Sequence, residues 1–422
     1  MKCAIIADDN TGASDAAGML TERGMSACLS LDGKTDMKMF SRFDAVVLGT
    51  RSRAVAPKKA YRITAQALEN ILPLKPRLVQ IKYCSTFDST PAGNIGASLD
   101  AAMDVSGARS IIVCPALPVN QRITVMGYHF VNGTLLSESP MLNHPLNPMT
   151  DSNLVRWLSL QTRRKVALAD ISEVRKGTVS LRAYFKKLEA AGISYIVTDA
   201  INERDIRITM DASSGKRIIS GASGISAEIP RILACSRRKL SFCKRIRRLA
   251  PGMAVVSGSM SPATRIQNEN AIKAGFSGFP VDAAKVLARK FDESDLVKKA
   301  LFSISSGKAV LVYTSATDSD GVEKMSSRLG LDPVQAGSLI GNKLASISEK
   351  LVRSGLVGRF VASGGETSGT ICERLGYSLL EVGLPIAPGV PYCFPIGGQE
   401  IMLVLKSGNF GGLDLYEKVR NI

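Results

Sequence analysis

The chain has 422 residues, of which 45% are hydrophobic and 37 are glycine, and its net charge is +17. This length accommodates two or three domains with complete cores, and this composition is typical of a globular α/β protein. No apolar run is long enough to span a bilayer and the chain reaches Asp8 and Asp9 before a signal-length apolar region forms, so we expect a cytoplasmic protein with no membrane partner.

The cysteine and histidine content limits the chemistry that the protein can perform. The eight cysteines are scattered, show no CxxC or other metal-ligand spacing, and several lie in apolar runs. We therefore expect buried free thiols that pack as small hydrophobic groups. His129 and His144 are the only histidines, which excludes a histidine-rich metal site.

The positive charge is concentrated between Arg231 and Arg248. Such a cluster is compatible with a nucleic-acid partner or with a protein that handles anionic small molecules. Aromatic residues make up only 5% of the chain and do not alternate with the basic ones, so platforms for stacking single strands are missing. We favour a solvated basic helix or linker at a domain boundary.

The first predicted strand, Cys3 to Ala7, is followed by two adjacent carboxylates, Asp8 and Asp9, and then by a helix from about Ser14 to Arg23. Two neighbouring carboxylates repel each other unless they are solvated or face a cation or a cluster of donors. A capping role at the N-terminus of the helix is the structural alternative.

The next clear strand, Ala45 to Gly49, ends in a segment that contains Arg51 and Arg53. Either arginine could bind a substrate carboxylate through two parallel hydrogen bonds, or lie in solvent. A helix from Pro57 to Leu72 leads to the following strand.

The most informative stretch runs from Ile81 to Gly96, where a strand is followed by a polar loop and a helix. Loops in this position lie at the carboxyl ends of strands, where open α/β sheets bind ligands. Its hydroxyl, amide, ammonium and carboxylate groups suit a small polyhydroxy acid, although an ordinary capped βα connection is the alternative. The polar residues of interest are Lys82, Ser85, Thr86, Asp88, Ser89, Thr90 and Asn94.

A strand from Ser110 to Cys114 precedes a proline-rich polar segment that extends to Asn153. We expect this segment to lack regular structure and to form a functional or mobile loop, because it is long for a simple connection. Strand patterns resume at Ile193 to Thr198.

The second half contains three junctions at which a strand meets a glycine-bearing loop, at Ser257–Ser261, Ser363–Gly369 and Lys406–Gly412. Glycines let backbone N–H groups approach phosphate oxygens, and a helix N-terminus adds favourable partial charge. The sequence contains no GxxxxGK[ST] and no strand-linked GxGxxG. We predict two α/β domains with mainly parallel sheets, neither a P-loop nor a Rossmann fold, and an anion or nucleotide site in the second.

Several motifs together resemble the four-carbon acid sugar kinases, and KYCSTFDST and HPLNPMTDSNL resemble most the 3-oxo-tetronate kinase branch. The resemblance extends from Ile6 to Gly412. In one departure, the family usually has SGSCS where this chain has SGSMS, so Met260 replaces a cysteine and could alter local packing. The other motifs are IADDNTGASDAAG, PALPVNQRITVMGYHFVNG, GGETSG and KSGNFGG.

The resemblance implies an acid-sugar-binding domain at 1–235, a basic interdomain segment at 236–250 and a nucleotide-binding domain at 251–422. It implies transfer of the γ-phosphoryl group of ATP to the 4-hydroxyl of a 3-oxo-tetronate, in the catabolism of carbohydrate acids. Residues that match the ATP-binding motifs are Ser259, Gly364, Gly365, Glu366, Thr367 and Gly408.

The resemblance leaves the catalytic roles less defined. Mg²⁺ is expected with ATP, with Glu366 or an N-terminal aspartate as ligand, but the motifs do not fix the metal site. Asp88 is our first choice for the base, ahead of Asp9. The substrate-binding candidates are Asp8, Arg51, Lys82, Ser89, Thr90 and Asn94.

The expected partners are the acid sugar and ATP, and a homo-oligomer is compatible with the sequence. A threonate or erythronate kinase of the same family is the alternative within the enzymes. A basic nucleic-acid-binding protein is the alternative from another class, although we expect no nucleic-acid partner.

Overall fold

The computed structural model describes residues 1–33, 36–144, 147–235, 242–315 and 319–422. The chain forms two compact units, Met1–Lys239 and Leu240–Ile422, and each is described by itself. The predicted basic segment at 236–250 lies across this division, and its residues 236–241 are outside the described part of the chain.

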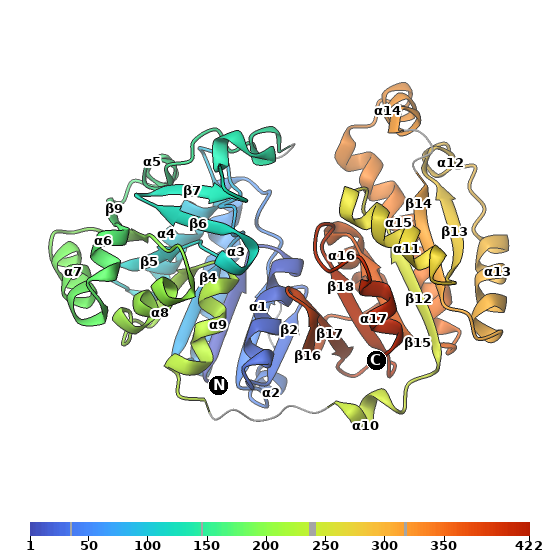
Figure 1. Ribbon diagram of the computed structural model, residues 1–422, viewed down its shortest axis with the longest axis horizontal. Helices are drawn as coiled ribbons and strands as arrows, with labels where there is room; N and C mark the ends of the chain where they lie inside the picture. Colours follow the sequence, from blue (N-terminus) through green and yellow to red (C-terminus); the bar gives the residue numbers. More distant parts are fainter. Residues whose placement is uncertain (34–35, 145–146, 236–241, 316–318) are drawn as a thin grey trace. The chain divides into compact units, whose positions relative to one another are not determined.

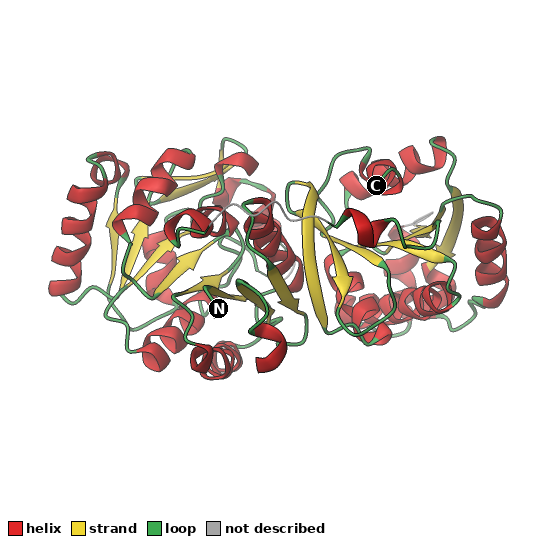
Figure 2. Cartoon of the chain, turned by 90° about the horizontal axis from the view of Figure 1, so that it is seen from below, coloured by secondary structure: helices red, strands yellow, loops and turns green. Residues whose placement is uncertain are grey.

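The N-terminal unit is built on a parallel sheet with helices on both of its faces (Figures 1 and 2). The strand order is β2-β3-β1-β4-β11-β5-β10-β9, and the paired strands run parallel. The strands are β1 (Cys3–Ala7), β2 (Ala27–Ser30), β3 (Ala45–Gly49), β4 (Leu78–Lys82), β5 (Ile111–Cys114), β9 (Val166–Ala169), β10 (Tyr195–Thr198) and β11 (Ile218–Gly221).

Two layers of helices cover this sheet. α1 packs on α9, α9 on α8 and α8 on α7 in one layer, while α3 packs on α4 and α4 on α5 in the other. The helices are α1 (Asn10–Glu22), α2 (Met37–Phe40), α3 (Pro57–Ile71), α4 (Asn94–Ser106), α5 (Leu154–Leu160), α6 (Ile171–Arg175), α7 (Thr178–Ala190), α8 (Glu203–Ala212) and α9 (Ser223–Ile232).

Helix α1 begins at Asn10, earlier than the predicted Ser14, because Asp9 caps it. Asp9 has an extended backbone and its side chain accepts a hydrogen bond from the Gly12 N–H, which satisfies one of the free donors of the first turn. The polar first turn of this helix is buried along with its apolar face, so hydrophobic periodicity alone placed the start too late.

The segment from Asn120 to Asn153 corrects the prediction that it lacks regular structure. It contains an antiparallel sheet of β6 (Arg122–Val125), β7 (Tyr128–Val131) and β8 (Thr134–Leu135), followed by single turns of 3₁₀-helix. Met126, Gly127, Asn132 and Gly133 adopt the positive φ angles that tight hairpin turns require. Residues 145–146 lie outside the described part.

The C-terminal unit is a mostly parallel sheet of strand order β13-β14-β12-β15-β18-β17-β16, in which β16 and β17 are antiparallel. The strands are β12 (Gly252–Ser257), β13 (Ser277–Asp282), β14 (Val310–Ser315), β15 (Val357–Ser363), β16 (Leu379–Ala387), β17 (Val390–Pro395) and β18 (Met402–Lys406). The α/β class predicted from the sequence is confirmed.

Helices again cover both faces. α11 packs on α17, whereas α15 packs on α12, α13 and α16. The helices are α10 (Cys243–Ile246), α11 (Pro262–Lys273), α12 (Ala283–Leu287), α13 (Ser294–Ser305), α14 (Ser319–Arg328), α15 (Pro333–Arg353), α16 (Gly365–Leu375) and α17 (Leu415–Arg420).

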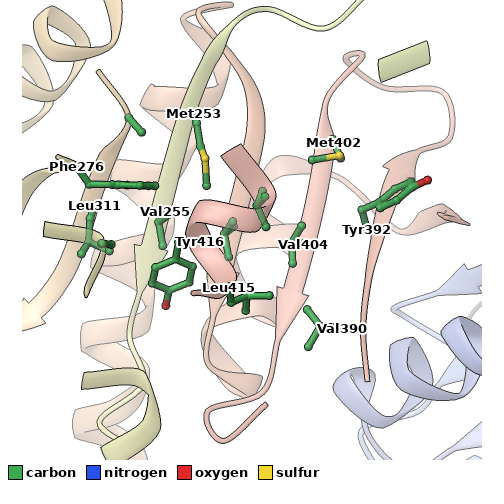
Figure 3. Close-up of a cluster of buried hydrophobic side chains, with 14 of the residues drawn as sticks. Met253, Val255, Phe276, Leu311, Val390, Tyr392, Met402, Val404, Leu415 and Tyr416 are labelled. Carbon is green, nitrogen blue, oxygen red and sulfur yellow. The ribbon is translucent and has the colours of Figure 1, made fainter. Parts of the chain in front are cut away.

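The core of this unit forms where α17 meets the sheet. Figure 3 shows Leu415 and Tyr416 of α17 among apolar side chains of β12, β17 and β18, including Val255 and Val404. Leu415 is fully buried, and burial of a leucine side chain contributes about 1.5 to 3 kcal/mol. This packing fixes the sheet whose strand ends carry the glycine loops.

The basic segment is only partly the solvated surface that we predicted. Arg247 and Arg248 are exposed. Arg245 instead forms ion pairs with Glu381 and Glu400 and lies over the Phe394 ring, 4.2 Å from its centroid. The prediction was wrong for Arg245 because these acidic and aromatic partners are more than a hundred residues away in the sequence.

Candidate functional site

The first candidate site lies where the crossover connections of the N-terminal sheet diverge. β1 and β4 are neighbours, but the chain leaves β1 through α1 toward β2 and leaves β4 through α4 toward β5, on the opposite side. Open α/β sheets bind ligands in the crevice outside the carboxyl ends of strands at such a switch point. The loops that begin at Asp8 and at Tyr83 therefore occupy the expected position.

Arg53 holds both aspartates of the first loop. Its Nε and Nη2 atoms lie 2.9 and 2.7 Å from the two carboxylate oxygens of Asp8, and Nη2 lies 2.6 Å from Asp9 Oδ1. The Thr11 hydroxyl donates to the other Asp9 oxygen at 2.5 Å. Of the alternatives that the sequence left open for the two carboxylates, the structure has a cation opposite them, and that cation is Arg53.

A third carboxylate, that of Asp15 in α1, extends the cluster together with the ammonium of Lys82, and both of these side chains are buried. Burial raises the pKa of Asp8 and of Asp15, although Arg53 opposes the shift at Asp8 and Lys82 opposes it at Asp15. Burial acts in the same sense on Asp9, but the charges of Arg53 and Lys82, together with hydrogen bonds from Thr11 and Gly12, outweigh it and lower the pKa of Asp9. Asp9 is therefore the carboxylate most firmly held in its ionised form.

Close packing keeps these charges together. A Cβ atom on Gly12 would lie 2.3 Å from both Asp9 Oδ1 and Lys82 Nζ, so only glycine fits there without displacement. The Asn94 amide of α4 donates to the Ser52 carbonyl at 3.3 Å and also to the Arg53 carbonyl. Asn94, predicted as a substrate contact, thus bonds to the loop that carries Arg53.

Arg51, the predicted carboxylate clamp, is exposed and has a left-handed backbone with φ of 52°. Arg53, two residues later, is the arginine that the structure brings to the aspartates. The strand pattern allowed either arginine, and Arg51 was our substrate-binding candidate. Which of the two reaches the aspartates depends on the direction of the chain after β3.

The loop after β4 packs on the segment around α5. Asp88 is buried and accepts a hydrogen bond of 2.7 Å from the Asn147 amide. Ser89 is fully buried, donates to the Phe87 carbonyl at 2.8 Å, and accepts from Trp157 Nε1 and Gln161 Nε2 at 3.1 and 2.9 Å. Ser89 is therefore bonded on all sides by protein groups, while Thr90 is half-buried.

His129 of β7 is a buried imidazole in the same unit. Its Nδ1 atom lies 3.0 Å from the Thr124 hydroxyl, and burial lowers the pKa of His129 to about 4. The ring is therefore neutral at physiological pH.

The second candidate site lies at the switch point of the C-terminal sheet. β12 and β15 are neighbours, and the chain leaves them through α11 and α16 on opposite sides. The glycine loops that follow β12, β15 and β18 come together at this edge. A Cβ atom on Gly408 would lie 2.6 Å from the Ser259 hydroxyl, and one on Gly258, in the loop after β12, would lie 2.3 Å from the Thr367 hydroxyl.

The start of α16 presents backbone donors to this site. Gly364 has φ of +124°, a conformation that favours glycine, while Gly365 and Glu366 are exposed on the first turn. The first N–H groups of a helix have no partner within the helix and carry partial positive charge. Met260 is exposed, so its replacement of the usual cysteine does not crowd the core.

Four residues of these sites did not stand out in the sequence as candidates: Asp15, Asn147, Gln161 and Lys406. Asp15 lies within a helical pattern and Asn147 within a proline-rich segment, and neither position marks its residue as a site residue. Lys406 had a detectable signal, because a lysine ends an apolar strand directly before a glycine loop, as Lys82 does at the end of β4.

Metal sites and membrane spans are two further features that bear on function. Within the described residues, no three histidine, cysteine, aspartate or glutamate side chains are grouped so that they could hold a metal ion. Over the same residues, no helix is both long and apolar enough to cross a membrane.

Comparison with known proteins identifies the family. A family model described as a sugar-binding N-terminal domain matches residues 3–229, and one described as a nucleotide-binding C-terminal domain matches residues 254–415. The 3-oxo-tetronate kinase of Pseudomonas savastanoi pv. phaseolicola is 36% identical over 417 residues, which cover 98% of this chain and 95% of the relative.

Solved structures agree over the full length. A Haemophilus influenzae protein is similar with a TM-score of 0.80 and 33% identity, covering 99% of both chains. A Salmonella typhimurium protein, whose description mentions a tRNA synthase, has a TM-score of 0.85 and 31% identity, covering 99% of this chain and 98% of its own. The chain therefore belongs to the four-carbon acid sugar kinase family, in which a sugar-binding N-terminal domain is joined to a nucleotide-binding C-terminal domain.

Proposed function

We propose that the protein is an ATP-dependent 3-oxo-tetronate 4-kinase, which transfers the γ-phosphoryl group of ATP to the terminal hydroxyl of the acid. The observation that carries this proposal is the similarity to 3-oxo-tetronate kinases over nearly the whole chain. The two polar switch-point sites, one in each matched domain, support it because a kinase needs one site for each substrate.

The N-terminal site has the groups that an acid sugar requires. Lys82 and Arg53 provide positive charge for the substrate carboxylate, and Thr90 and the aspartates provide hydrogen-bonding groups for its hydroxyls. Asp88 is proposed as the base because its carboxylate is held by Asn147 at the switch-point loop. Asn94 and Ser89 position the two loops.

The C-terminal site is proposed to bind ATP through the backbone donors and hydroxyls around Ser259, Gly364 to Thr367, and Gly408. Mg²⁺ usually keeps several waters and binds through one or two carboxylates plus the phosphates, so it does not need a preformed cage of side chains. Glu366 fits this role because its carboxylate is exposed at the first turn of α16. Asp9 fits it less well, because both of its oxygens already accept hydrogen bonds.

The reaction needs little covalent chemistry from the protein. Phosphoryl transfer depends mainly on alignment and on stabilisation of the charge on the phosphoryl oxygens, and Mg²⁺ supplies part of that stabilisation. The backbone donors at the start of α16 orient the phosphates. Asp88 accepts the proton of the attacking hydroxyl.

A coupled ADP-release assay on 3-oxo-tetronates, threonate, erythronate and no acid tests the proposal. We expect turnover that depends on the acid, is fastest with a 3-oxo-tetronate and persists at moderate salt. Faster turnover with threonate or erythronate would assign the substrate to the other branches. No turnover with any acid, together with DNA or RNA binding that falls steeply with salt, would replace the proposal with the nucleic-acid alternative.

A further inference from the structure

Lys406, the last residue of β18, has a fully buried side chain at the nucleotide-side switch point. Its ammonium donates to the Thr264 hydroxyl at 2.9 Å, to the Ser407 carbonyl at 3.1 Å and to the Gly408 carbonyl at 2.9 Å. A lysine ammonium has three donors, so these three acceptors satisfy it completely. All three acceptors are uncharged.

The positive charge of Lys406 is therefore solvated by dipoles alone. The charged side chains on the elements around β18 are Arg359 on β15, Arg265, Glu269 and Lys273 on α11, Glu366, Glu373 and Arg374 on α16, and Glu417, Lys418 and Arg420 on α17. Burial is what lowers the pKa of Lys406, to about 8. Within the described residues, none of these carboxylates forms an ion pair with Lys406, and a buried cation without a counter-ion favours binding of an anion beside it.

The same contacts orient the loop after β18. The Gly408 carbonyl accepts from Lys406, from the Ser261 hydroxyl at 2.7 Å and from the Thr264 hydroxyl at 2.7 Å. Further along, the Gln267 amide donates to the carbonyls of Phe410, Gly411 and Gly412, at 3.2, 3.1 and 2.9 Å. The carbonyls of this loop are thus hydrogen-bonded to side chains at the start of α11.

In a trans peptide the N–H points opposite to the carbonyl, so the amide that follows each tied carbonyl is directed away from α11. Successive backbone N–H groups that face one way form a concavity suited to an anion. The acceptor side of the loop is therefore used within the protein. Of its donors, the Phe410 N–H bonds to the Ser407 carbonyl at 3.2 Å, and the N–H groups that follow the bonded carbonyls are left for a ligand.

We propose that Lys406 is a positioning residue of the nucleotide site, which fixes the Gly408 loop with its N–H groups toward the phosphates and supplies the buried positive charge that attracts them. This inference rests on the proposed function, which places ATP at these loops. Lys406 acts through the loop and through its charge, because its own donors are already used.

Binding of ADP, measured without Mg²⁺ by calorimetry on the full chain between pH 7.5 and 9.5, tests the proposal. Since ADP binds more tightly to protein with a charged Lys406, affinity should be constant below about pH 8 and fall by about tenfold for each further pH unit, until the pKa of the complex is reached. The terminal phosphate of ADP is already ionised in this range and adds no slope. Lys406→Met should bind ADP at least tenfold more weakly at pH 7.5 and show no such slope.

Two further variants separate this role from a structural one. Thr264→Val removes one hydrogen bond to the Gly408 carbonyl but keeps the charge of Lys406. It should therefore weaken ADP binding and keep the dependence of ADP affinity on pH. Lys299→Met, which removes an exposed lysine of α13 in the same unit, should match the wild type. If Lys406→Met does not fold, the wild-type pH series and Thr264→Val still decide the matter.

The proposal is overturned if wild-type affinity is independent of pH over this range, or if Lys406→Met binds ADP like the wild type. These readouts do not use the acid substrate. A protein that binds ADP with the expected slope but phosphorylates no four-carbon acid would refute the proposed function and leave the role of Lys406 intact.

Discussion

Arg53 contacts Asp8 at two points, with Nε–Oδ2 and Nη2–Oδ1 distances of 2.9 and 2.7 Å, and the same Nη2 atom reaches Asp9. Removing this guanidinium would leave two neighbouring carboxylates, one of them buried, without their nearest cation. Because breaking a buried ion pair costs about 3 kcal/mol or more, we expect Arg53→Gln to lower the free energy of unfolding by about that amount. Urea denaturation measures this, and steady-state kinetics should show a raised KM for the acid.

Arg51→Gln is the matched control, since Arg51 lies two residues away and is exposed. We expect its unfolding free energy to stay within about 0.5 kcal/mol of the wild type and its KM for the acid to change little. If Arg51→Gln raises the KM for the acid and Arg53→Gln does not, the clamp predicted from the sequence is correct and our assignment to Arg53 is wrong.

Asp88→Asn tests the proposed base without disturbing its surroundings. The new amide can still accept the hydrogen bond from Asn147 through its oxygen, so we expect normal folding. Loss of the carboxylate should lower kcat by about 10²-fold, which is typical of a positioned general base, and leave the affinity for ATP unchanged. Unchanged kcat with a raised KM for the acid would make Asp88 a binding residue.

Gly408→Ala tests whether ATP binding needs the close contact between the loops that follow β12 and β18. The added methyl would lie 2.6 Å from the Ser259 hydroxyl, so one of the loops must move, and we expect the KM for ATP to rise about tenfold or more. Gly341→Ala is the control, because Gly341 is within α15 and the nearest atom to its new methyl would be 3.9 Å away. That variant should bind ATP normally and gain up to about 1 kcal/mol in stability.

Arg245→Gln should destabilise the protein, whereas Arg248→Gln should not. Arg245 pairs with Glu381 and Glu400 and stacks over Phe394, and loss of these contacts should cost about 1 to 2 kcal/mol. Arg248 is exposed, so its substitution should be neutral within about 0.5 kcal/mol in the same denaturation experiment. If the two substitutions have equal effects on stability, the prediction of a solvated basic surface holds for Arg245 as well.

His129 should make the protein less stable as the solution is acidified. Its pKa is lowered by burial from 6.5 to about 4, so between these values the unfolded chain binds more protons than the folded one. Stability should therefore fall as the pH falls from 6.5 to 4, by up to about 3 kcal/mol from this group. His129→Gln should remove that part of the pH dependence in denaturation curves, and a curve with an unchanged slope would contradict the assignment.

The strand ends of both units could be predicted because apolar runs of β-branched residues stop where polar loops begin. Cys3–Ala7 and Ala45–Gly49 were predicted with their observed bounds. The loops that follow β4, β12, β15 and β18 were located for the same reason, since buried parallel strands have continuous hydrophobic sequences.

Partners that are distant in the sequence could not be predicted from local patterns. Arg53 rather than Arg51 meets Asp8 because of the backbone direction after β3, and Asn147 meets Asp88 across 59 residues. The hairpin of β7 and β8 did have a sequence signal that the prediction overlooked, because Asn132-Gly133 is a dipeptide typical of two-residue hairpin turns. The hairpin of β6 and β7 turns at Met126-Gly127, and its signal is weaker because methionine rarely adopts a positive φ angle.

The arrangement of both candidate sites at the carboxyl ends of strands leaves the opposite edge of the N-terminal sheet free of these functions. There, the connections before β5, β10 and β11 contain Gly107, Gly192 and Gly215, all exposed. Exposed loop tips of this kind tolerate inserted chain better than buried segments do. A fluorescent reporter domain inserted at Gly192 or Gly215 should therefore leave the switch-point loops undisturbed and provide a labelled enzyme.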